Sequence, residues 1–146
     1  MINRSRLPLY DRRGVAALEF AVIAPLLFSV MFGVIEFGLV LNEYLTLTNA
    51  TLVGAMQFAF SAGVDATPYT DAVNAINAAA PNLTPLRIAF SVNGTACGTD
   101  TACQTAMSNG TGYVTVSTSY SCAALNFALN LLPNCSLTAQ QTERVQ

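Results

Sequence analysis

The feature that most constrains this chain is a single apolar stretch, residues 15–41, in which only Glu19 and Glu36 are ionisable. The ten Leu, Ile, Phe and Val side chains between Phe20 and Ile35 supply about 3 to 6 kcal/mol toward insertion into a membrane, whereas one carboxylate at the bilayer centre costs roughly 2.5 to 3.5 kcal/mol. On a helix the two carboxylates would stand about 25 Å apart, close to the ~30 Å thickness of the hydrocarbon core. Each can therefore lie near one headgroup region. The stretch is predicted to cross a membrane at about 18–41.

The distribution of arginine predicts the orientation of this helix. Only one acid, Asp11, offsets the basic start, and no further arginine follows until Arg87. The positive-inside rule then makes residues 1–14 a cytoplasmic leader and exports residues 63–146. A cleaved secretory signal peptide also begins with basic and apolar residues, but this apolar run is about twice as long as a signal core. The four arginines of the leader are Arg4, Arg6, Arg12 and Arg13.

Composition argues against several classes of function. Charged residues make up 10% of the chain, the formal net charge is −2, and histidine is absent. Without a basic patch outside the leader, nucleic acid is not expected as a partner. The lack of histidine excludes Ser-His-Asp and Cys-His catalysis, and no glycine-rich phosphate loop is present. We therefore expect neither an enzyme nor a bound cofactor.

Four cysteines lie beyond the membrane helix, in what the topology makes an oxidising compartment, where disulfides form. The exported part is small for a self-sufficient core, so cross-links are expected. Three pairings are possible, and short loops favour two local bridges, each worth about 2 to 3 kcal/mol in the chain-entropy model. A metal site is not expected, because there is no histidine and no Cys-x-x-Cys pair. The favoured pairs are Cys97 with Cys103 and Cys122 with Cys135.

Periodicity predicts the remaining elements. Helical spacing continues the first helix over 15–62, and a second helix is predicted from Pro68 to Ala80. Alternation of apolar and polar residues then predicts strands at about 86–93, 113–120 and 136–145, with Asn93-Gly94 as a turn. An apolar loop or short helix is expected at 125–133. The predicted class is α+β, with a long N-terminal transmembrane helix packed on a small three-stranded antiparallel sheet that disulfides staple.

The N-terminal region resembles the opening of TadE-like proteins, the small pseudopilin-like components of tight-adherence (Flp-type) pilus systems. The resemblance covers residues 12–54, and its most specific element is Glu36 within a Phe-Gly-Val-Ile-Glu-Phe-Gly string. It implies a pilin-like fold and a minor pilin or pseudopilin in the bacterial inner membrane. The implied partners are other pilin and pseudopilin subunits and the Tad inner-membrane assembly machinery. The implied roles are pilus assembly and surface adhesion, with incorporation into an extracellular pilus as a further expectation.

The resemblance also implies processing at Gly14. A membrane-embedded prepilin peptidase would cut after this residue and leave Val15 as the new N-terminus. The ammonium group created there would neutralise the Glu19 carboxylate of a neighbouring subunit, and Glu36 is a second candidate for assembly. Simpler interpretations remain open, because Gly14 can start a helix and both carboxylates can be hydrated at the membrane surfaces.

Two further functions fit the same residues. One is an uncleaved, single-pass anchored module whose disulfide-stapled domain binds a ligand outside the membrane. The other is a tip adhesin, which shares the processing but contacts its ligand through loops at 94–112 or 123–134. Only the pilin-type functions require the loss of residues 1–14, so the mass of the mature chain separates them from the anchored module.

Overall fold

A computed structural model describes residues 12–61, 64–108, 110–122 and 135–145. The chain divides into two compact units, residues 1–38 and 39–146, and helix α1 (Arg12–Phe60) contributes to both. The helix begins at Arg12 rather than at the predicted Val15. The apolar loop or short helix expected at 125–133 lies outside the described residues.

In the first unit, α1 presents apolar side chains on its surface. The exposed fractions of Leu18 and Val22 are 68% and 71%, so these side chains do not form the core of a soluble domain. Within the part of the chain that the structure describes, α1 is the one helix long and apolar enough to cross a membrane. A helix suits that environment, because it satisfies its backbone hydrogen bonds internally.

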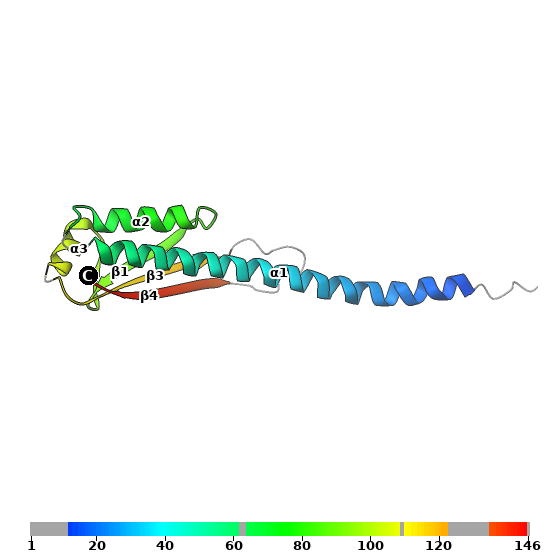
Figure 1. Cartoon of the computed structure of the whole chain (residues 1–146). Coiled ribbons are helices and arrows are strands. Elements are labelled where there is room, and N and C mark those ends of the chain that lie inside the picture. The colour runs from blue at the N-terminus through cyan, green and yellow to red at the C-terminus, as the bar shows by residue number, and fades with distance from the viewer. Residues whose placement is uncertain (1–11, 62–63, 109, 123–134, 146) are drawn as a thin grey trace, which may run out of the picture. The chain divides into compact units, whose positions relative to one another are not determined.

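The second unit contains a four-stranded antiparallel sheet with the order β2-β1-β3-β4, of which Figure 1 labels β1, β3 and β4. Its strands are β1 (Leu86–Val92), β2 (Thr95–Cys97), β3 (Tyr113–Ser121) and β4 (Ser136–Arg144). The expectation of three strands was therefore wrong, and β2 is the additional one.

The turn that introduces β2 was predicted, although the strand was not. Asn93 and Gly94 have φ angles of 51° and 82°, and Val92 pairs with Thr95 across them. Positive φ at both central residues is what a tight two-residue hairpin requires, and Asn-Gly meets that requirement. The three residues of β2 are too few for an alternating pattern to be visible in the sequence.

Two shorter helices accompany the sheet: α2 (Pro68–Ala79), which was predicted to end at Ala80, and α3 (Asp100–Met107), which was not predicted. The Asp100 carboxylate accepts hydrogen bonds from the Thr70 backbone N–H at 2.9 Å and the Thr70 hydroxyl at 2.7 Å. The Thr70 hydroxyl bond contributes most, and the Thr70 backbone bond next, to lowering the pKa of Asp100, because both bonds stabilise the ionised carboxylate. These bonds join the start of α3 to α2.

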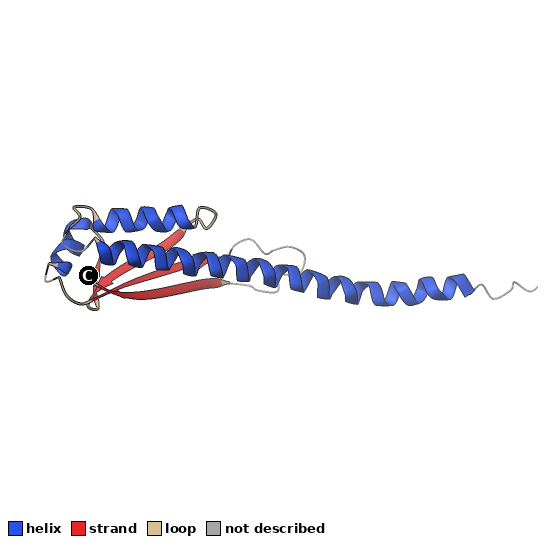
Figure 2. Ribbon diagram, viewed as in Figure 1, coloured by secondary structure: helices blue, strands red, loops and turns tan. Residues whose placement is uncertain are grey.

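The core of the second unit lies where α1 and α2 cover one face of the sheet (Figure 2). The Phe90 ring of β1 contacts Phe58 of α1 and Tyr69 of α2, with ring centroids 4.8 and 5.1 Å apart. A Cβ atom on Gly54 of α1 would overlap the buried side chain of Ile76 of α2, so the glycine permits the close approach of the two helices. The largest fully buried apolar side chains include Phe58, Leu47, Ile76, Val92, Val114 and Val116.

One polar pair fixes α1 against the sheet. The hydroxyls of Thr51 in α1 and Thr118 in β3 are both buried and lie 2.6 Å apart. Thr51 also donates to the Leu47 carbonyl oxygen at 2.7 Å. A buried hydroxyl without a hydrogen-bond partner costs free energy. The bond between Thr51 and Thr118 therefore favours the one position of α1 along the sheet in which these two hydroxyls meet.

Candidate functional site

The candidate processing site occupies the start of α1. Gly14 falls in the first turn of the helix, and a Cβ atom added there would meet no other atom within 4 Å. Packing within the described residues does not require a glycine at this position, and the same holds for Gly33 and Gly38 of α1.

Val15 and Glu19 lie one helical turn apart, so their side chains share a face of α1. The Glu19 side chain is exposed, and the exposed fractions of the adjacent Leu18 and Phe20 are 68% and 66%. A carboxylate thus stands in an apolar helical surface. In a membrane such a group is costly unless it meets water or a cation, which makes it a candidate contact between subunits.

Glu36 occupies a different environment from Glu19, although the sequence suggested similar positions near two headgroup regions. Its side chain is buried, with 7% of its surface exposed. Glu36 stays a candidate for assembly on the evidence of the sequence alone.

The cysteines form two disulfides in the expected pairings. Cys97 is bonded to Cys103 with the Cα atoms 5.2 Å apart, which joins β2 to α3. Cys122 is bonded to Cys135 with the Cα atoms 5.3 Å apart, where β3 ends and β4 begins. Among the described residues no group of three or more His, Cys, Asp or Glu side chains could hold a metal ion.

Sequence reasoning missed Glu43, which follows the predicted membrane segment. Its Oε2 atom is buried without a hydrogen-bond partner among the described residues, and desolvation raises the pKa of its carboxyl group. The carboxyl group borders a cavity of about 180 Å³, together with Asn42 and Thr46 of α1 and Asn82 and Leu83. No local pattern could reveal this burial, because residues 82 and 83 reach α1 only in the folded chain.

We expect Glu43→Gln to stabilise the second unit at neutral pH and to have no effect at low pH. A raised pKa means that the folded state holds the proton more tightly than the unfolded chain does, so stability is lost as pH rises from the ordinary value of 4.5 through the folded-state pKa. Glutamine carries no such penalty. The measurement is thermal unfolding of the full chain in detergent, followed by near-UV circular dichroism as a function of pH. An equal difference from the parent chain at every pH would contradict the desolvation of Glu43.

Comparison with known proteins identifies one related family. A family model described as TadE-like protein matches residues 14–60. This match confirms the resemblance predicted from the sequence, and it ends where α1 ends, before the sheet begins. No curated protein and no solved structure matched the chain.

Proposed function

We propose that this chain is a minor pilin or pseudopilin of a Tad (Flp-type) pilus. It is anchored in the bacterial inner membrane by α1 and acts in pilus assembly and surface adhesion. The TadE-like match over residues 14–60 supports this assignment. The observation that carries it is Glu19, an exposed carboxylate in an apolar helical surface, one turn beyond Val15 and five residues after Gly14.

In the proposed mechanism, a prepilin peptidase cuts the chain after Gly14 at the cytoplasmic face. Hydrolysis of the Gly14–Val15 peptide bond leaves a carboxylate on the leader and an ammonium group on Val15. The ammonium of one subunit pairs with the Glu19 carboxylate of its neighbour. Lateral association is favoured because each charge is costly in lipid when alone and less costly when paired.

Residues 63–146 are exported in this proposal. Two disulfides support that side of the membrane, because structural disulfides persist in oxidising compartments such as the bacterial periplasm. A small domain stapled in this way stays folded outside the cell, which suits a pilus component.

Co-expression with a prepilin peptidase tests the processing step. We expect intact-mass measurement of the membrane-extracted chain to reveal the loss of residues 1–14, and a catalytically inactive peptidase to leave the chain whole. If the chain keeps Met1 beside an active peptidase that cuts a known pilin in the same cells, the uncleaved anchored binding module becomes the better account.

A further inference from the structure

The charges of the second unit are segregated. Its cationic side chains are Arg87 and Arg144, and both lie on the face of the sheet that points away from α1 and α2. The register fixes this placement: Arg87 pairs with Ser119, and Ser119 pairs with Thr138, from which Arg144 is an even number of residues along β4. The carboxylate side chains of the unit lie elsewhere and belong to Glu43, Asp65, Asp71, Asp100 and Glu143.

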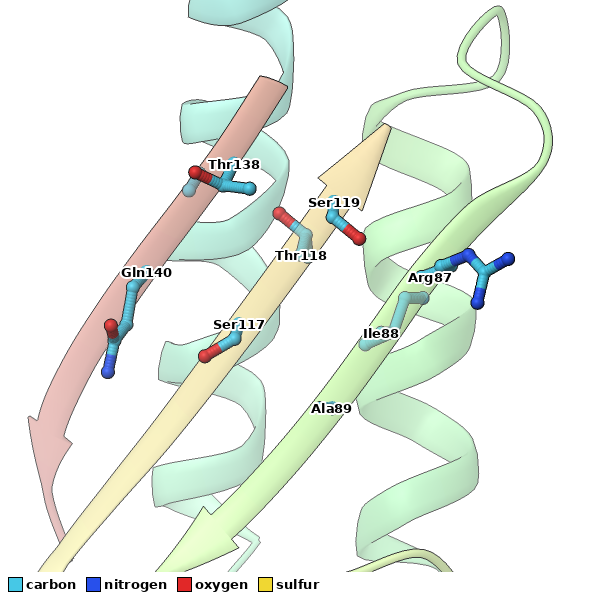
Figure 3. A pocket seen from close by; sticks show the side chains of 9 residues that line it. Arg87, Ile88, Ala89, Ser117, Thr118, Ser119, Thr138 and Gln140 are labelled. Atoms are coloured by element: carbon cyan, nitrogen blue, oxygen red, sulfur yellow. The ribbon is translucent and has the colours of Figure 1, made fainter. Parts of the chain in front are cut away.

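This outer face contains a groove beside Arg87 (Figure 3). The groove encloses about 310 Å³, at the lower end of the volumes typical of small-ligand sites. The short side chains of Ser117 and Ser119 on β3 leave the middle of the groove open. The longer side chains of Arg87 on β1 and Gln140 on β4 border it (Figure 3). The outward-facing residues that line it are Arg87, Ala89, Ser117, Ser119, Thr138 and Gln140, and none of them is buried.

The lining combines one permanently charged cation, Arg87, with groups that both donate and accept hydrogen bonds. A guanidinium group presents a planar fork of donors that matches a carboxylate. Serine and threonine hydroxyls and the glutamine amide can each bind a hydroxyl as donor or acceptor. This chemistry fits a ligand that carries a carboxylate and several hydroxyls on one small ring.

From this groove we infer that the outer face of the sheet binds an acidic polysaccharide built from uronic-acid units. Arg87 holds the carboxylate of one sugar, Ser117 and Ser119 contact the hydroxyls of that sugar, and Gln140, two strands away from Arg87, contacts the next sugar. The inference does not depend on processing at Gly14 or on assembly, because the groove belongs entirely to the second unit.

Other partners fit this face less well. A second copy of the chain offers fewer acids than its sequence suggests, since Asp100 is bonded to Thr70 and Asp71 accepts from the Thr67 hydroxyl at 2.7 Å. Nucleic acid would engage this face mainly through its phosphates, which use the arginines alone, whereas a uronic acid also uses the hydroxyl and amide groups of the groove.

The test measures binding of oligogalacturonate to the full chain in zwitterionic nanodiscs at low ionic strength. We expect Arg87→Gln to weaken binding about tenfold, the usual effect of losing a charge-assisted hydrogen bond. Arg144→Gln is the matched control, because it removes the same charge from the same face outside the groove, and it should weaken binding by less than about threefold. Both arginines are exposed, so neither change should affect folding, which circular dichroism verifies.

Three comparisons can overturn the inference. Equal weakening by the two variants would indicate diffuse attraction to charge rather than a site at Arg87. Equal binding of methyl-esterified oligogalacturonate would remove the role of the carboxylate. Binding of polyglutamate or double-stranded DNA as tightly as the sugar would point to general affinity for polyanions, and no binding of oligogalacturonate to the parent chain would refute the site outright.

Discussion

Replacing Glu19 with leucine should give a chain that is stable, membrane-inserted and cleaved, yet joins other pilin subunits poorly. Insertion should become easier, because a carboxylate is removed from an apolar helix. Assembly should suffer, because the Val15 ammonium of a neighbour loses its partner. Breaking a buried ion pair by removing one member costs about 3 to 5 kcal/mol, which corresponds to roughly a hundredfold or greater loss of association.

Co-purification with pilin partners and piliation of cells in which the variant is the sole copy measure this effect. Glu19→Asp keeps the carboxylate and serves as the matched control, with assembly expected to stay closer to that of the parent chain. Normal piliation by the leucine variant would remove the proposed role of Glu19 and favour a hydrated interfacial carboxylate.

A valine at Gly14 should abolish cleavage. A Cβ atom at this position would meet no other atom within 4 Å, and valine is a better helix former than glycine, so folding and insertion should persist. A peptidase that approaches the backbone at this residue would instead meet a branched side chain. Intact-mass measurement after co-expression with the peptidase should then find only the chain with residues 1–14 still attached.

The control for this change lies on the same helix. Gly38 is equally free of contacts within 4 Å, so Gly38→Val introduces the same side chain far from the cleavage site, and we expect normal processing. Cleavage of the Gly14→Val chain at the usual bond would mean that the peptidase does not read the glycine.

Elements governed by local patterns could be predicted from the sequence. The apolar stretch predicted α1, and the alternation of apolar and polar residues predicted β1, β3 and β4. The short loops between cysteines predicted the two disulfide pairings. The Thr95–Cys97 strand and the Asp100–Met107 helix were missed. Each is too short for its period to emerge. β2 is held by pairing with the neighbouring strand β1, and α3 is held by bonds to Thr70, a residue far from it in the sequence.

The candidate sites divide in the same way. Gly14, Val15 and Glu19 lie within six consecutive positions of one helix, so the sequence was sufficient to associate them. Burial of Glu43 depends on Asn82 and Leu83, and the groove at Arg87 depends on the register of three strands. Such sites become visible only when the tertiary structure brings separate segments together.

The central claim is that this chain, once processed, becomes part of a pilus assembly. Pili sheared from cells that express the chain, separated from membranes and analysed by N-terminal mass spectrometry, test it most directly. We predict that the pilus fraction contains the chain beginning at Val15. Pili that lack the chain, with the protein confined to membranes and still beginning at Met1, would contradict the claim.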